Sequence, residues 1–172
     1  MIEDLKDPRR QEPAYVLDES EMLEAWLEFH RATLELKCEG LSDEQLKQRP
    51  VETSALSLHG LVRHLAEAER SWFRRVLLIQ PDLPRIWCTD DNPDLDLLPL
   101  DNASWSTDLI VWQNECALAR EVAARVSINH TGMRDGEPCS LRWILNHMIE
   151  EYARHNGHAD LIREMVDGKV GW

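Results

Sequence analysis

The sequence lacks the features of a secreted, membrane-spanning or nucleic-acid-binding protein. Its four cysteines stand far apart without a Cys-x-x-Cys pair, which indicates buried thiols rather than a disulfide framework. Only 19 Lys and Arg oppose 32 Asp and Glu, and the net charge of −13 argues against nucleic acid and anionic membranes as partners. No apolar run approaches the length of a membrane span, and residues 1–10 are too polar for a secretory signal. We therefore expect a cytoplasmic protein.

What is present fits a single domain over residues 1–172. Hydrophobic residues make up 43% and charged residues 30% of the chain, and there is no internal repeat. Residues 1–17 contain two prolines and an Arg pair, and we expect them to form an arm along the body. Apolar residues then recur at the helical period and show no strand pattern. Serine or aspartate caps and glycine or proline stops predict helices over about 18–40, 57–80, 104–126 and 140–167.

The connection between the second and third of these helices is unusually long. Residues 81–103 contain four prolines and six aspartates and have no helical period. Extended, they reach about 70 Å, which is enough to return along a helix of about 35–40 Å. Helices two and three should therefore run parallel. We expect an all-α fold, a four-helix bundle of up-down-down-up topology with a long crossover between helices 2 and 3.

The densest group of chemically active side chains lies between Asn146 and Asp160, where three histidines accompany two adjacent glutamates. On a helical projection His155 points into the apolar face, and Glu151, one turn earlier, lies at the inner edge of that face. A buried carboxylate beside a buried imidazole is costly unless something binds them. A divalent metal accepts both ligand types at this spacing, so we predict a metal site.

A third ligand has to come from another helix, and His64 is our choice. It lies beside the core face of the helix expected over 57–80, and its neighbours one turn away, Gly60 and Ala68, are small. An alternative interpretation treats His64 and His155 as core histidines that are hydrogen-bonded to carboxylates such as Glu151. A His₂Glu set suits Zn²⁺ first, and Ni²⁺, Fe²⁺ or Mn²⁺ as well.

Four further residues are candidates for supporting roles around such a site. Glu67, one turn from His64, could orient its ring, although a solvated charge is the simpler interpretation. His147 and His158 fall at the edge of the helix face, in a second shell or at the surface. Arg154 could bind an anionic substrate, and surface ion pairing is its default role.

Two stretches resemble the DinB/YfiT-like superfamily, namely S-L-H-G-L-V-R-H-L-A-E-A-E-R-S-W-F around His64 and S-L-R-W-I-L-N-H-M-I-E-E-Y-A-R-H-N-G-H-A-D-L-I-R-E-M-V-D-G around His155. The likeness runs from about Asp18 to Gly168 and is nearest to a group of actinobacterial proteins related to mycothiol-dependent maleylpyruvate isomerase. In the superfamily one histidine of helix two and two residues of helix four hold a metal. The helix-four pair is usually His-x-x-x-His, but Glu151 takes the first position here, as in the isomerase branch.

The resemblance implies a metal-dependent enzyme in which a low-molecular-weight thiol attacks a small electrophile, as a transferase or an isomerase. It places the metal on His64, Glu151 and His155. The expected partners are the thiol and the electrophile, with a homodimer as a further option. Two alternatives stay open: a non-catalytic stress-response or interaction bundle without metal, and a metal-assisted hydrolase that uses bound water.

Overall fold

The computed structural model describes residues 7–98 and 100–170. Residues 1–6 of the expected arm lie outside this part of the chain. The elements follow one another as α1 (Glu19–Cys38), α2 (Asp43–Lys47), α3 (Leu58–Glu69), the π-helical η2 (Arg70–Leu77), α4 (Trp105–Ala124), β1 (Thr131–Arg134), β2 (Glu137–Ser140) and α5 (Leu141–Asp167).

The prediction of an all-α fold, a pure four-helix bundle, is wrong, because the described residues also form a two-stranded antiparallel sheet and the fold is mixed α/β. The sheet is a hairpin in which Arg134 pairs with Glu137 across the two-residue turn Asp135-Gly136. Both turn residues have positive φ, 51° and 85°, as the tight turns that suit hairpins require. The hairpin docks on η2 at Gly132, where a Cβ would lie 2.1 Å from the backbone oxygen of Val76.

Serine side chains begin the helices that carry the site. The hydroxyl oxygens of Ser57 and Ser140 accept hydrogen bonds from the backbone N–H groups of the third helical residue, at 3.0 and 3.2 Å, which satisfies donors that a helix start leaves free. Gly168 closes α5 in the left-handed conformation. The two serine caps fix where α3 and α5 begin, and so determine which turns of the two helices lie opposite each other.

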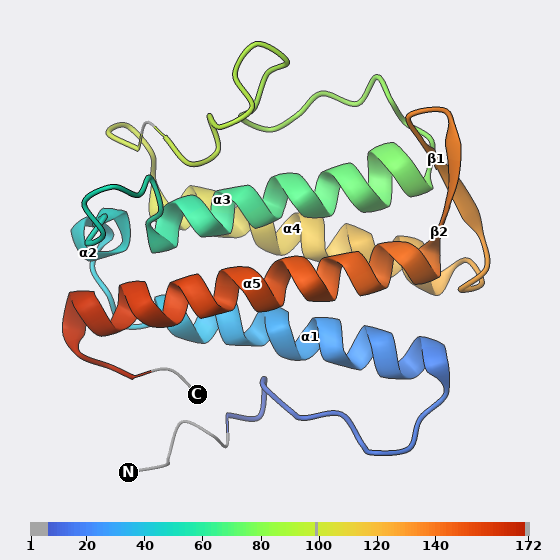
Figure 1. Cartoon of the computed structure of the whole chain (residues 1–172), viewed down its shortest axis with the longest axis horizontal. Coiled ribbons are helices and arrows are strands. Elements are labelled where there is room, and N and C mark those ends of the chain that lie inside the picture. The colour runs from blue at the N-terminus through green and yellow to red at the C-terminus, as the bar shows by residue number, and fades with distance from the viewer. Residues whose placement is uncertain (1–6, 99, 171–172) are drawn as a thin grey trace.

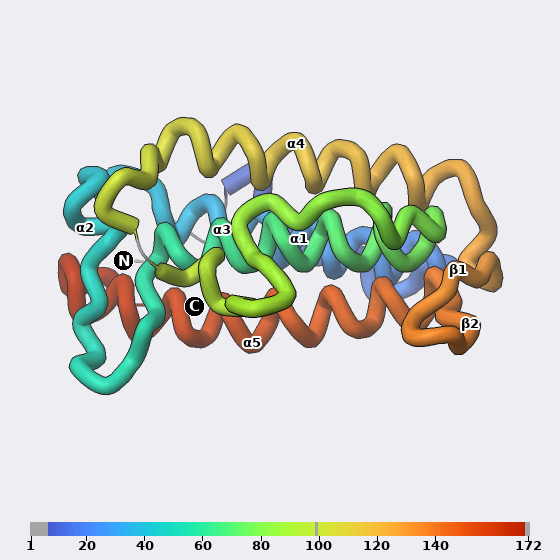
Figure 2. The backbone as a smooth tube through the Cα atoms, turned by 90° about the horizontal axis from the view of Figure 1, so that it is seen from above, coloured from blue at the N-terminus to red at the C-terminus, as the bar shows by residue number. Residues whose placement is uncertain are grey.

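The long helices lie side by side, with α3 and α4 running in one direction and α1 and α5 in the other (Figure 1). The crossover that joins α3 and η2 to α4 passes over α3 on the side between α4 and α5 (Figure 2). The core between the helices is mainly apolar, and its fully buried members include Leu34, Leu61, Leu65 and Met148.

One polar network crosses this core. The guanidinium of Arg31 on α1 donates to both carboxylate oxygens of Glu69 on α3, at 2.8 and 2.6 Å. The hydroxyl of Tyr152 donates to Glu69 at 2.8 Å and accepts from the indole N–H of Trp112 at 2.9 Å. Burying charges costs free energy unless they are paired, so these bonds tie four helices to one arrangement.

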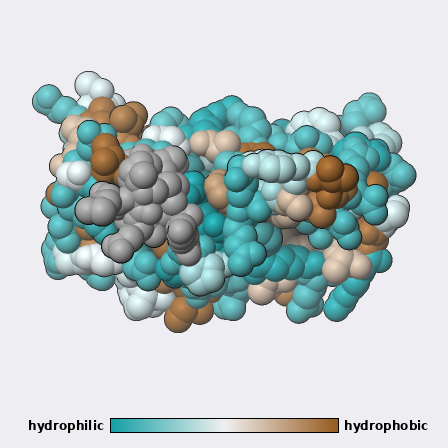
Figure 3. Space-filling view, turned by 90° about the horizontal axis from the view of Figure 1, so that it is seen from below, coloured by the Kyte–Doolittle hydropathy of each residue, from teal (hydrophilic) through white to brown (hydrophobic). Residues whose placement is uncertain are grey.

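No helix in the described part of the chain is both long enough and apolar enough to cross a bilayer. The face seen from below in Figure 3 is mainly hydrophilic, with hydrophobic side chains scattered between polar ones.

Candidate metal centre

Three predicted side chains meet between α3 and α5. His64 reaches across from α3, and Glu151 and His155 approach from successive turns of α5. The Nε2 atom of His64 lies 3.1 Å from Oε1 of Glu151, and the Nε2 atom of His155 lies 3.5 Å from the same oxygen. One ligand atom from each of the three residues falls within 4.8 Å of the other two. The structure thus brings together the set chosen from the sequence as a possible metal-binding triad.

The spacing of these atoms fits a small divalent ion. Zinc bonds to His nitrogen and carboxylate oxygen are about 2.0–2.2 Å long, so neighbouring ligands of a tetrahedral site are separated by about 3.3–3.6 Å. The nitrogen–oxygen separations of 3.1 and 3.5 Å are close to this range, and the ligand nitrogens of the two histidines lie within 4.8 Å of each other. The side chains of His64, Glu151 and His155 are 29%, 14% and 12% exposed, so the site is largely desolvated but still reachable from solvent.

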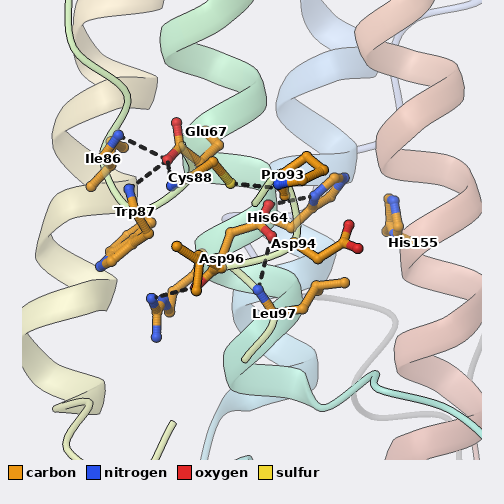
Figure 4. A network of polar contacts seen from close by, with 12 residues as sticks. His64, Glu67, Ile86, Trp87, Cys88, Pro93, Asp94, Asp96, Leu97 and His155 are labelled. Carbon is orange, nitrogen blue, oxygen red and sulfur yellow. Dashed lines mark hydrogen bonds and ion pairs between the residues drawn. The ribbon is translucent and has the colours of Figure 1, made fainter. Parts of the chain in front are cut away.

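Asp96, from the crossover, fixes the ring of His64. Its Oδ2 atom lies 2.8 Å from Nδ1 of His64, and its other oxygen accepts the backbone N–H of Leu97 at 2.8 Å. The residue is only 3% exposed. Figure 4 shows Asp96 among the crossover residues gathered over α3, with His155 approaching from the neighbouring helix. A carboxylate behind a ligand histidine sets the tautomer that leaves the far nitrogen free for a metal.

The charges at the centre are strongly coupled. Burial alone would lower the pKa of His64, but hydrogen bonds to Asp96 and Glu151 raise it to about 9. Hydrogen bonds from His155 and His64 hold the pKa of Glu151 well below its usual range. Without metal, a protonated His64 therefore bridges two carboxylates near neutral pH. A metal that binds Nε2 of His64 has to displace that proton.

The two remaining histidine candidates on α5 lie differently. The ring of His158 stands next to His155, with their Nδ1 atoms 3.3 Å apart. His147 is stacked on Trp143, with ring centroids 5.0 Å apart, and packs edge-on against Trp72. Burial lowers the pKa of His147. His158 therefore touches the candidate centre, whereas His147 forms part of an aromatic cluster one turn away.

Glu67, a candidate for orienting the ring of His64, is bonded to the crossover instead. Its Oε1 atom accepts three backbone N–H groups of the crossover, from Ile86, Trp87 and Cys88, at 2.6–2.9 Å. The thiol of Cys88 in turn donates to the backbone oxygen of Pro93 at 3.0 Å. Glu67 therefore anchors the crossover that delivers Asp96, and its influence on His64 is indirect.

Arg154 faces the surface rather than a substrate cavity. It is hydrogen-bonded to Glu150 on the same helix, and its second guanidinium nitrogen lies 3.7 Å from Oε2 of Glu151. The positive charge thus sits on the outer side of the Glu151 carboxylate. The crossover packs on the small residue Gly60 one turn from His64, where a Cβ would lie 3.2 Å from the backbone oxygen of Leu97.

Sequence reasoning missed Asp96, the residue that completes the environment of His64. The available signal was the excess of aspartates in residues 81–103. Nothing in the sequence selects one of these six aspartates as the partner of His64. Which of them reaches His64 depends on how Glu67 and the turns of the crossover place the chain.

The fold and the site together define a helical protein with a His₂Glu cluster between two helices and a second carboxylate behind one histidine. The sequence model of the mycothiol S-transferase family matches residues 22–168, and the chain belongs to that family. This confirms the resemblance to the DinB-like superfamily and its mycothiol enzymes. Neither the curated proteins nor the solved structures that were compared with the chain gave a match.

Proposed function

We propose that the protein is a metal-dependent S-transferase that joins the sulfur of mycothiol to a small electrophile. The metal would be held by His64, Glu151 and His155, with Zn²⁺ as the first choice. A bound divalent cation supplies the charge that lowers the pKa of a thiol, so that the sulfur arrives as a thiolate at neutral pH. The thiolate then bonds to the electrophilic carbon, and the bond from that carbon to its leaving group breaks.

The chain's own residues prepare this reaction. Asp96 accepts a hydrogen bond from the Nδ1–H of His64 and keeps Nε2 of His64 directed at the centre. Glu151 stays ionised because its pKa is held low, so it offers an anionic ligand without losing a proton first. Three protein ligands leave a further position for an incoming sulfur, as catalytic zinc sites require.

The cysteines of the chain support an external source of sulfur. All four are buried. Burial raises the pKa of Cys38 to about 12 and that of Cys88 to about 11, and it also raises the pKa of Cys116 and Cys139. Since the thiolate is the nucleophile, a cosubstrate thiol is the better candidate.

The observation that carries the proposal is the meeting of three ligand atoms within 4.8 Å of one another, with nitrogen–oxygen separations of 3.1 and 3.5 Å. The test is to purify the protein without a histidine tag and to measure its metal content together with mycothiol-dependent alkylation by a model alkyl halide. We expect about one metal per chain and metal-dependent transfer in the wild type. Glu151→Ala should lose both.

Glu150→Ala is the matched control, since Glu150 is the adjacent residue of α5 and its half-exposed carboxylate pairs with Arg154. It should keep metal and activity. A wild-type protein that neither contains nor binds metal would favour the alternative of a non-catalytic bundle, in which the hydrogen bonds of His64 and Glu151 are purely structural. Ester hydrolysis without added thiol would instead favour the hydrolase.

A further inference from the structure

The two candidate histidine ligands are oriented in the same way. His64 and His155 both turn Nε2 toward Oε1 of Glu151, at 3.1 and 3.5 Å. Each ring then has its Nδ1 atom directed at another side chain. For His64 that partner is Asp96, at 2.8 Å, and for His155 it is Nδ1 of His158, at 3.3 Å.

The nitrogen–nitrogen contact between His155 and His158 requires one donor and one acceptor. A histidine that gives the lone pair of Nε2 to a metal carries its proton on Nδ1. The Nδ1–H of His155 would then donate to His158, whose Nδ1 has to be the unprotonated acceptor with its proton on Nε2. Metal binding at His155 thus selects one tautomer for both rings.

We propose that His158 is a positioning residue for the metal centre. Its Nδ1 atom accepts a hydrogen bond from the Nδ1–H of His155 and so keeps Nε2 of His155 directed at the metal. This inference rests on the proposed function. His158 follows His155 by three residues on α5, and the rings meet edge to face with centroids 5.2 Å apart. The orienting partner of His155 therefore lies on the same helix, three residues further along, whereas the partner of His64 comes from the crossover.

Two substitutions of His158 can distinguish the hydrogen bond from simple packing. In asparagine Oδ1 occupies about the place of histidine Nδ1 and can accept the same proton, whereas leucine has a similar size and no acceptor. Leucine is also the better helix former of the two. His158→Asn and His158→Leu are therefore a matched pair that separates hydrogen-bond acceptance from bulk and helix stability.

The experiment measures the Zn²⁺ dissociation constant of each protein by competition with a chromophoric chelator, and the unfolding temperature of each metal-free form. Loss of an orienting partner typically weakens metal binding by about 10–100-fold. We expect His158→Leu to weaken zinc binding by at least about tenfold while its metal-free unfolding temperature stays at or above that of His158→Asn. His158→Asn should stay within about threefold of the wild type, as should the control His130→Leu, which alters an exposed histidine between α4 and β1.

Equal affinities for the wild type and His158→Leu would overturn the role of His158, and so would equal losses in the Leu and Asn variants. Either result leaves the proposed function standing, provided that the wild type binds zinc and transfers mycothiol. A wild type that does not bind zinc removes the proposed function itself, and with it this inference.

Discussion

Protonation of His64 in the metal-free protein gives a stability prediction with a definite sign. Despite burial, the hydrogen bonds to Asp96 and Glu151 raise the pKa of His64 from 6.5 to about 9. A group whose pKa rises on folding stabilises the folded state fully below its unfolded pKa, and this contribution disappears as the pH passes the folded pKa. The stabilisation should therefore be complete at about pH 6 and lost at about pH 10.

The shift also sets the size of the effect. One pKa unit corresponds to about 1.4 kcal/mol, so the full shift gives a ceiling of about 3 kcal/mol. The side chain of His64 is 29% exposed, and solvent screening reduces the contribution of an ion pair at such a position. We therefore expect the metal-free protein to lose about 1–2 kcal/mol of unfolding free energy through this group.

The assay is urea unfolding of chelator-treated wild type and His64→Gln between about pH 6 and pH 10. The free-energy difference between the two proteins should shrink as the pH rises through about 9. The control His130→Gln changes an exposed histidine and should follow the wild type at every pH. A wild-type advantage over His64→Gln that stays constant or grows with pH would refute the reasoning.

Three further predictions concern other parts of the molecule. Glu69→Ala removes the buried carboxylate that binds Arg31 through both oxygens and leaves this 3% exposed residue only the partly exposed Glu28 as an ionic partner. It should cost about 3–5 kcal/mol in urea unfolding; the exposed control Glu121→Ala should cost less than about 0.5 kcal/mol, and equal losses would contradict this. Gly157→Ala should raise the unfolding temperature, since an added Cβ meets nothing within 4 Å and alanine is favoured over glycine by up to about 1 kcal/mol; a lower temperature would show a hidden clash. Asp96→Asn should weaken zinc binding about 10–100-fold in chelator competition, and unchanged affinity would remove its orienting role.

The helices were predictable because local chemistry decides them. Serine caps and apolar periodicity located α3, α4 and α5, and the phase of α5 turned Glu151 and His155 to one side. The choice of His64 followed from its place at the edge of an apolar stripe. The sequence alone therefore allowed the prediction that side chains of α3 and α5 meet at one point.

The hairpin was not predicted, and the crossover was predicted only as a connection, without its course over α3. The dipeptide Asp135-Gly136 is a strong hairpin signal, but the strands around it are four residues long and show no apolar alternation. The crossover has no periodicity, and its course depends on tertiary bonds such as those that Glu67 accepts. Asp96 could therefore be placed behind His64 only once the loop was seen.

The most direct test of the central claim is X-ray absorption at the zinc edge, recorded on the zinc-loaded protein with and without mycothiol. The three-residue site predicts only nitrogen and oxygen neighbours before the thiol is added. Mycothiol should then introduce one sulfur neighbour at about 2.3 Å. Sulfur neighbours in the absence of thiol, or none in its presence, would contradict the account.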